Sequence, residues 1–148
     1  PSGKAPAFTL VKNDLSELNI SDLRGKKVIL NIFPSLDTSV CAASVRKFNV
    51  EAARIPGVVV VCVSKDLPFA HGRFCETEGI KNVETASEFR DNDFSTAYGI
   101  LITDGPLKGL HARAVVVIDE DGEIVYKELV AEIVAEPNYA AALAAVNK

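Results

Sequence analysis

The chain of 148 residues contains no tryptophan, no methionine, two histidines and three cysteines. Three cysteines do not make a structural disulfide framework in a chain of this length, and no Cys-x-x-Cys pair occurs. With so few cysteines and histidines, a four-ligand zinc site would need distant residues to converge. Because a chain of this size buries roughly 70% of its unfolded surface, it needs neither kind of cross-link. We therefore expect no metal and no cofactor.

Long apolar runs and clusters of positive charge are also absent. No apolar run approaches the roughly 18 residues of a membrane span, and the run at 58–63 has the length of a strand. A formal net charge of −4 without a basic cluster argues against a nucleic-acid partner. No secretory leader is present as written. We expect one cytoplasmic domain over residues 1–148, without membrane or nucleic-acid partners; a missing leader would allow a periplasmic location.

The apolar pattern predicts an α/β fold. The uninterrupted run at 58–64 indicates a strand buried on both faces, as in a parallel sheet. Gly25 and Gly79 end a helical turn and a helix, respectively. We expect an opening β-ribbon of residues 7–11 and 16–20, strands at 27–33, 58–64 and 82–85, a hairpin of 113–118 and 123–129, and helices at 38–54, 69–78, 87–98 and 137–146. A βαβ half followed by a ββα half around a central mixed sheet is the thioredoxin-like fold, with helices flanking the sheet.

The segment PSLDTSVC, residues 34–41, follows the apolar strand 27–33 and opens a helix. A cysteine in the first helical turn faces unpaired backbone N–H groups and the positive end of the helix dipole. Both favour the thiolate, which is the nucleophilic form of cysteine. A lone cysteine is more often a small buried apolar residue. The Pro-xxx-Thr-xx-Cys spacing after a strand favours a reactive sulfur at Cys41.

This octet resembles the signature of the peroxiredoxins. Further segments resemble their thiol peroxidase branch, the atypical two-cysteine peroxiredoxins: NIFPS at 31–35, CAASVRKF at 41–48, DLPFA at 66–70, RFC at 73–75 and DGPLKGL at 104–110. The resemblance runs from about residue 7 to residue 146. Members of this branch usually carry more residues before the equivalent of Ala7.

The resemblance implies that Cys41 is the peroxidatic nucleophile. Its thiolate would attack hydrogen peroxide or an organic hydroperoxide and become a sulfenic acid. Thr38 would hydrogen-bond sulfur and substrate, Arg113 would hold the thiolate and polarise the peroxide, and Pro34 would cover the sulfur. Each residue also has a purely structural interpretation: Pro34 as a strand end, Thr38 as a helix cap and Arg113 as an exposed charge at a strand edge.

The resemblance also implies that Cys75 resolves the sulfenic acid as an intramolecular disulfide with Cys41, which thioredoxin then reduces. Because a disulfide needs Cα atoms within roughly 7 Å, we expect both helices to unwind locally when it forms. The structural alternative for Cys75 is a buried helix residue. Cys62 lies in an apolar run and is interpreted as a core residue. His71 and Cys75 sit four apart, a weak metal signal against a surface histidine and an unrelated cysteine.

Family resemblance further implies a homodimer that packs near the active-site face through the loop 104–109. A groove for alkyl hydroperoxides is expected from the apolar residues Phe33, Leu36, Leu101, Ile102 and Leu107. Two other functions remain open: a redox sensor that uses the same disulfide as a switch, and a cysteine hydrolase that pairs Cys41 with His71 or His111.

Overall fold

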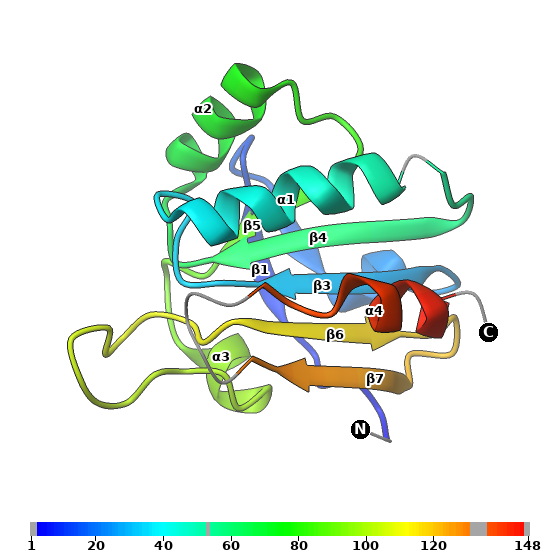
Figure 1. Ribbon diagram of the computed structural model, residues 1–148. Coiled ribbons are helices and arrows are strands. Elements are labelled where there is room, and N and C mark those ends of the chain that lie inside the picture. Colours follow the sequence, from blue (N-terminus) through cyan, green and yellow to red (C-terminus); the bar gives the residue numbers. More distant parts are fainter. Residues whose placement is uncertain (1–2, 53, 131–135, 147–148) are drawn as a thin grey trace.

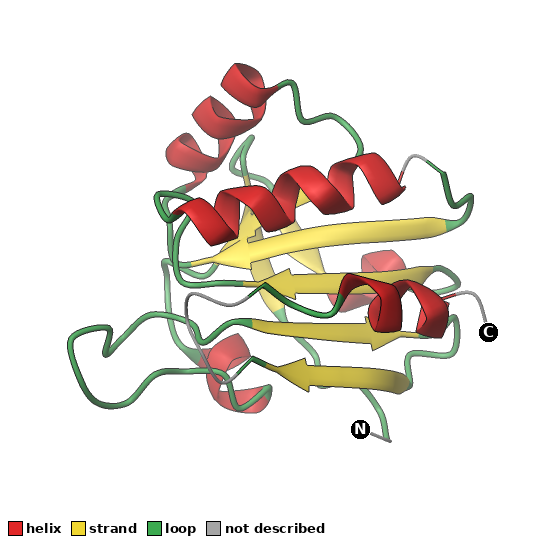
Figure 2. Ribbon diagram, in the orientation of Figure 1, coloured by secondary structure: helices red, strands yellow, loops and turns green. Residues whose placement is uncertain are grey.

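The computed structural model describes residues 3–52, 54–130 and 136–146, which form one mixed sheet with helices on both faces (Figure 1). The sheet has seven strands in the order β2-β1-β5-β4-β3-β6-β7. Figure 2 shows helices on either side of that sheet. This is the expected thioredoxin-like α/β arrangement with an N-terminal β-ribbon, and the prediction of the fold is confirmed. Within these residues, no helix combines the length and the apolar character that crossing a bilayer requires.

The elements follow one another in the expected order. The strands are β1 (Thr9–Lys12), β2 (Glu17–Asn19), β3 (Lys27–Ile32), β4 (Val58–Ser64), β5 (Glu84–Ser87), β6 (Ala114–Ile118) and β7 (Ile124–Leu129). The helices are η1 (Ile20–Leu23, a 3₁₀ turn), α1 (Ser39–Ala52), α2 (Pro68–Glu78), α3 (Asp93–Ala97) and α4 (Tyr139–Val146). Gly79 ends α2 with a left-handed φ of 67°, which a glycine adopts without strain.

The sheet separates two apolar cores because side chains alternate along each strand. Ile29 of β3 packs with Val45 and Phe48 of α1 and with Val146 of α4 on the face that is in front in Figure 1. Its neighbour Leu30 points to the opposite face, in a cluster of buried residues that includes Phe8, Val61, Phe94 and Tyr98. Both faces of β3 are therefore covered, as the apolar sequence of this strand predicts.

Strand pairing brings three chain segments to one edge of the sheet. β3 runs parallel to β4, with Ile32 opposite Val63, and antiparallel to β6, with Ile32 also opposite Ala114. The residues that follow β3, follow β4 and precede β6 therefore meet at the left-hand edge of the sheet in Figure 1. Residues 33–38, called here the Cys41 loop, lie at this edge.

Three predicted elements differ from the structure in type or in bounds. The helix expected at 87–98, with Ser87 as its cap, is wrong: Ser87 ends β5, and only Asp93–Ala97 is helical. Ser87 pairs with Val11 on one side and with Ser64 on the other. These two long-range pairings override the local capping signal. The predicted strand 82–85 consequently lies two residues too early, and α4 begins at Tyr139 rather than at Pro137.

Replacing Leu30 by alanine tests how much the core that contains Leu30, Phe8 and Phe94 contributes to stability. Leu30 is 0% exposed on the central strand, and we expect Leu30→Ala to lower the free energy of unfolding. The lost apolar contact and the residual cavity should cost about 2–5 kcal/mol. The measurement is urea unfolding followed by far-UV circular dichroism. Val125→Ala on β7, where the side chain is 45% exposed, is the control and should change stability by less than about 0.5 kcal/mol. Equal effects of the two substitutions would contradict this assignment of the core.

Candidate active site

The Cys41 loop leads from the end of β3 into the first turn of α1. Phe33 N–H still donates to the Val63 carbonyl at 3.1 Å, and Pro34, which is buried, then ends the strand pairing. A turn follows in which Thr38 N–H donates to the Ser35 carbonyl at 3.3 Å. The Thr38 carbonyl accepts from Ala42 N–H at 3.0 Å, so helical hydrogen bonding starts at Thr38. Cys41 therefore lies in the first turn of α1, as predicted.

The Cys41 side chain is 0% exposed and packs in the front core. The sequence predicts a sulfur that is presented to substrate, whereas the structure buries it in a cluster that includes Phe33 and Leu36. The sulfur is thereby shielded from bulk water, and the dipole of α1 acts on it with little screening.

Arg113 is a buried cation beside this turn. It is 1% exposed, immediately precedes β6 and so lies at the sheet edge where β3 ends. The interpretation of Arg113 as an exposed strand-edge charge is wrong. Tyr139 of α4 is influenced by both residues: burial raises the pKa of its phenol, as do Glu136 and the Cys41 sulfur, while Arg113 opposes the rise. Cys41 and Arg113 thus each lie within electrostatic reach of Tyr139.

Tyr139 is a site residue that sequence reasoning missed. Its ring packs edge-on against Phe48 of α1 with centroids 5.3 Å apart, and its hydroxyl donates to Glu136 at 2.7 Å. A tyrosine at the start of an alanine-rich helix gives no local indication that it lies near a cysteine far away in the chain. Only the packing of α4 against α1 and β6 brings it to the Cys41 end of the sheet.

The Thr38 hydroxyl has a structural partner. The side chain is exposed, and its Oγ1 donates to the Ser35 carbonyl at 3.0 Å. This bond stabilises the turn before α1. It is not the bond of a helix cap, in which the side-chain oxygen accepts from a backbone N–H of the first turn. The lone pairs of Oγ1 remain able to accept a hydrogen bond from a substrate.

Cys75 and Cys62 are free thiols that occupy different environments. Cys75 is half-buried on the side of α2 that faces β5: burial raises its pKa, the nearby Thr85 hydroxyl lowers it and the charge of Glu84 raises it. Burial raises the pKa of Cys62 to about 12, and Asn31 Nδ2 lies 3.7 Å from its sulfur. Cys62 is the core residue that its apolar run predicts. Cys75 would have to leave β5 to reach Cys41.

Both histidines are buried, and their Nε2 atoms are bound elsewhere. His71, expected at the surface, is 0% exposed, and its Nε2 lies 2.8 Å from Ser64 Oγ. His111 Nε2 lies 2.7 Å from Glu88 Oε1. These bonds provide no support for a hydrolase that pairs either ring with Cys41. The structure also gives no support to a metal site at His71 and Cys75. Across residues 3–52, 54–130 and 136–146, no three potential metal ligands lie close together.

Asp66 is the second site residue that sequence reasoning missed. It follows β4 and accepts hydrogen bonds from Ser35 Oγ and from Leu36 N–H, each at 2.8 Å. Its carboxylate therefore holds the Cys41 loop. The partners are about thirty positions apart in the chain, so no local pattern indicates the contact.

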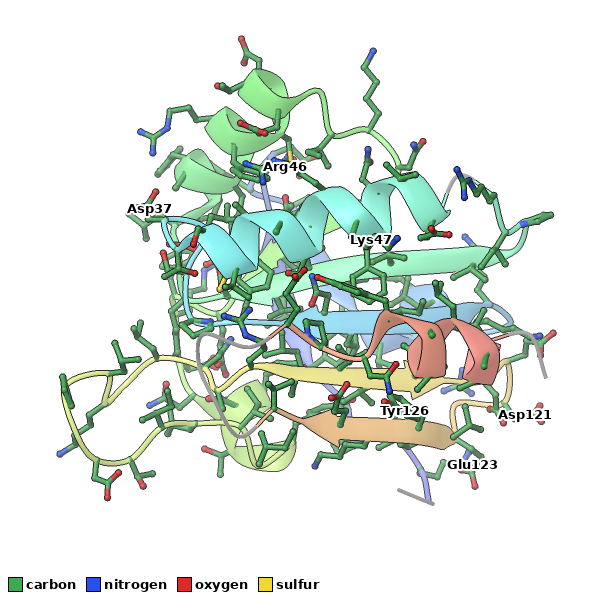
Figure 3. All side chains as sticks on the ribbon, in the orientation of Figure 1. Asp37, Arg46, Lys47, Asp121, Glu123 and Tyr126 are labelled. Carbon is green, nitrogen blue, oxygen red and sulfur yellow. The ribbon has the colours of Figure 1, made fainter. Side chains whose placement is uncertain are left out.

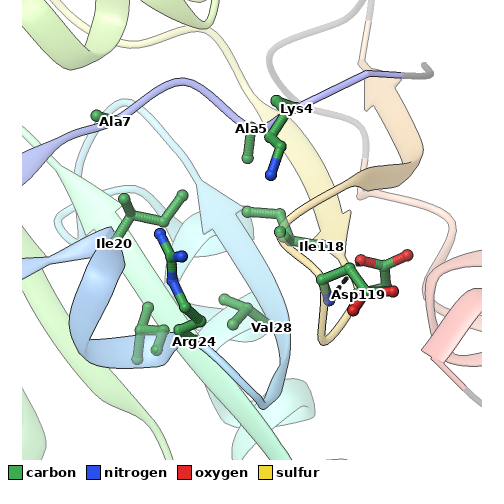
Figure 4. Close-up of a pocket in the computed structure, with 11 residues that line it drawn as sticks. Lys4, Ala5, Ala7, Ile20, Arg24, Val28, Ile118 and Asp119 are labelled. Carbon is green, nitrogen blue, oxygen red and sulfur yellow. Dashed lines mark hydrogen bonds between the residues drawn. The ribbon is translucent and has the colours of Figure 1, made fainter.

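Two small cavities lie at opposite ends of β3. One of about 140 Å³ lies between the Cys41 loop and α2, lined by Leu36 and Asp66 on one side and by Ala70, Arg73 and Phe74 on the other. A cavity of about 160 Å³, lined among others by Lys4, Arg24, Val28 and Asp119, lies at the opposite end of β3 (Figure 4). The alkyl groove expected from the sequence is not gathered in one of these cavities, since Phe33 is buried in the core and Leu107 is exposed on its loop.

The buried His71 predicts a pH dependence of stability. Burial lowers the pKa of His71 to about 4, although the charge of Asp66 opposes the change. Below about pH 6.5 the unfolded chain binds a proton at this ring that the folded chain refuses, so stability should fall as the pH drops from 6.5 towards 4. The loss between pH 7 and pH 5 should be about 2 kcal/mol.

His71→Gln removes this titration and should flatten the dependence of the unfolding free energy on pH over the same window. Urea unfolding at pH 5, 6 and 7 measures it. Arg73→Gln, at an exposed position on the same helix, is the matched control and should leave the slope unchanged. Identical slopes for the wild type and His71→Gln would show that His71 does not titrate in this way.

Comparison with known proteins gives the family of this chain. A family profile described as Redoxin matches residues 1–143. Thiol peroxidases of Mycobacterium tuberculosis and Mycobacterium bovis are 59% identical over 143 residues, which span 97% of this chain and 86% of each relative.

Solved structures agree with this assignment. A crystal structure of a peroxiredoxin-like protein from Aquifex aeolicus has a TM-score of 0.93 at 44% identity, over 99% of this chain and 85% of that one. A thiol peroxidase from Chromobacterium violaceum has a TM-score of 0.89 at 21% identity, over 98% and 84%, and so shares the fold. The chain therefore belongs to the Redoxin family, and within it to the thiol peroxidase branch of the peroxiredoxins, which are oxidoreductases.

Proposed function

We propose that this protein reduces hydrogen peroxide and organic hydroperoxides through Cys41, forms an intramolecular disulfide with Cys75, and is recycled by thioredoxin. The observation that carries the proposal is the placement of Cys41 in the first turn of α1, at the sheet edge where the buried Arg113 also lies. Membership of the thiol peroxidase branch supports the reaction class. We also propose a cytoplasmic homodimer; the exposed Leu107 on the loop 104–109 supports this loop as a contact.

In the first step, the Cys41 thiolate attacks the terminal oxygen of the peroxide. A sulfur–oxygen bond forms and the oxygen–oxygen bond breaks, so that Cys41 becomes a sulfenic acid and water or an alcohol leaves after taking up a proton. Negative charge grows on the leaving oxygen in the transition state. The guanidinium of Arg113 and the unpaired N–H groups of the first turn of α1 can stabilise that charge in a water-poor setting.

Pro34 and Thr38 complete this arrangement. Pro34, buried at the end of β3, keeps bulk water from the sulfur. The Thr38 hydroxyl donates to Ser35 in the resting state and would accept from, or reorient towards, the bound peroxide.

In the second step, the Cys75 thiolate attacks the sulfenic sulfur of Cys41. The sulfur–sulfur bond forms, and the hydroxyl group leaves as water after protonation. Because Cys75 faces Thr85 and Glu84 of β5, α2 must detach locally and the first turn of α1 must open for the sulfurs to meet. A thioredoxin dithiol then supplies two electrons and restores both thiols.

Cysteine variants test the two steps separately. Cys41→Ser should abolish peroxide consumption because the nucleophile is lost. Cys75→Ser should consume one equivalent of peroxide and then stop, because thioredoxin meets no disulfide. Cys62→Ala, the core control, should retain turnover in an assay coupled to thioredoxin and its reductase. Peptide mapping by mass spectrometry of the peroxide-treated wild type should find Cys41 joined to Cys75 and Cys62 free.

A wild type that consumes peroxide with thioredoxin while Cys41 and Cys75 stay unlinked would contradict the disulfide step alone. Stoichiometric oxidation without turnover would instead favour the redox-sensor function.

Arg113 variants test the electrostatic part of the first step. Arg113→Gln removes the cation, and we expect the second-order rate constant for peroxide consumption to fall about a hundredfold. Arg113→Lys keeps the charge but not the planar fork, so it should recover part of this loss. Rapid-quench measurement of a single turnover gives the rate constants. Thermal unfolding of each variant, as the control, separates a slow enzyme from an unfolded one, and a folded Arg113→Gln variant with the wild-type rate would refute the role.

A further inference from the structure

We infer that Asp66 is a positioning residue for the Cys41 loop, and that Ser64 and His71 extend its hydrogen bonds to the helix that carries Cys75. The Cys41 loop and α2 are thereby held closed by one network, called here the Asp66 network (Asp66, Ser35, Leu36, Ser64 and His71). The inference deepens the proposed function and rests on it for the movement of Cys75.

The loop side of the network depends on both carboxylate oxygens of Asp66. Oδ1 accepts from Ser35 Oγ at 2.8 Å, and Oδ2 accepts from Leu36 N–H at 2.8 Å. Ser35 Oγ in turn accepts from Asp37 N–H at 3.1 Å, which directs the next peptide of the turn. Hydrogen bonds to a carboxylate are among the stronger ones in proteins. Asp66 therefore holds the three residues that lead into the first turn of α1.

On the side of α2, the direction of each hydrogen bond follows from the fact that the Ser64 hydroxyl has only one proton to donate. Ser64 Oγ lies 2.7 Å from Asp66 Oδ2, and since a carboxylate only accepts, the hydroxyl donates there. Its lone pairs then accept from Asp66 N–H at 3.2 Å and from His71 Nε2, 2.8 Å away. His71 is therefore the tautomer that carries its proton on Nε2. Its Nδ1 is buried and has no hydrogen-bond partner among the residues that the structure describes.

His71 ties α2 to this arrangement on the turn that precedes Cys75. The two residues are four apart in α2 and so share a face of the helix. The small cavity between Leu36 and Phe74 separates the loop from α2 alongside the network. An ion pair of Arg46 with Glu78 at 2.7 Å links α1 to the far end of α2, on the side shown in Figure 3. That pair is largely exposed and contributes little.

Movement of Cys75 towards Cys41 would draw His71 away from Ser64. The Ser64 hydroxyl would lose one partner, and Asp66 would hold the loop less firmly at the moment when the first turn of α1 must open. Reduction of the disulfide would let α2 return and the network re-form, which would restore the loop for the next peroxide. The network thus couples the two conformational changes that the proposed reaction needs.

Hydrogen exchange of the reduced protein tests the network without any disulfide chemistry. Asp66→Asn removes the charge that accepts three hydrogen bonds, so the exchange rates of residues 34–41 and of residues 68–78 should both rise, by about tenfold. Asp37→Asn removes the same charge from an exposed position on the loop and should change both by less than about twofold. Unchanged exchange in α2 of a folded Asp66→Asn variant would overturn the proposal.

A pair of substitutions at His71 tests the coupling to the reaction. His71→Leu cannot donate to Ser64 and should speed formation of the Cys41–Cys75 disulfide after a single peroxide pulse, measured by rapid quench and mass spectrometry. His71→Gln can donate through its amide and should restore the wild-type rate. Equal rates in both variants would overturn the coupling. If no disulfide forms in the wild type, the proposed function fails, whereas hydrogen exchange still decides whether the network exists.

Discussion

The register of β3 between β4 and β6 is the constraint on which the candidate site depends. Ile32 lies opposite Val63 on one side and Ala114 on the other, so the chain leaves the sheet after Ile32 beside Ser64 and Arg113. A slip of one residue would exchange the two faces of β3 and place Ile29 in the wrong core. The two apolar cores thus determine which edge of the sheet the first turn of α1 and Arg113 share.

Burial of the sulfur and of the guanidinium has two opposing consequences. Cys41 and Arg113 are both buried, where water screens charges least, so a cation there stabilises negative charge more strongly than it would at the surface. The same burial denies a peroxide direct access to the sulfur. In the proposed reaction, access of a peroxide to this sulfur would therefore require local opening of the Cys41 loop.

The sequence predicts correctly those features that depend on residues close together in the chain. The apolar run of β4, the glycine that ends α2 and the cysteine in the first turn of α1 follow from neighbours in the chain, and all three are confirmed. Ser87 reads as a helix cap but pairs in β5, and His71 reads as a surface residue but is buried. Asp66 gives no signal because its loop partners lie about thirty residues away. These features depend on the assembled sheet and become predictable only when strand order is known.

In the proposed reaction α2 detaches in every catalytic cycle, and a helix that does so cannot be held as a core helix is held. Removing a packed apolar side chain from a core costs several kcal/mol, whereas one hydrogen bond contributes about 1 kcal/mol net, since water replaces it. α2 carries only two fully buried residues, Pro68 and His71, and Cys75 is half-exposed on it. The neutral hydrogen bond between His71 and Ser64 is specific in geometry and, at about 1 kcal/mol net, weaker than apolar packing of this kind. Such a bond suits a segment that has to return to one position after each reduction.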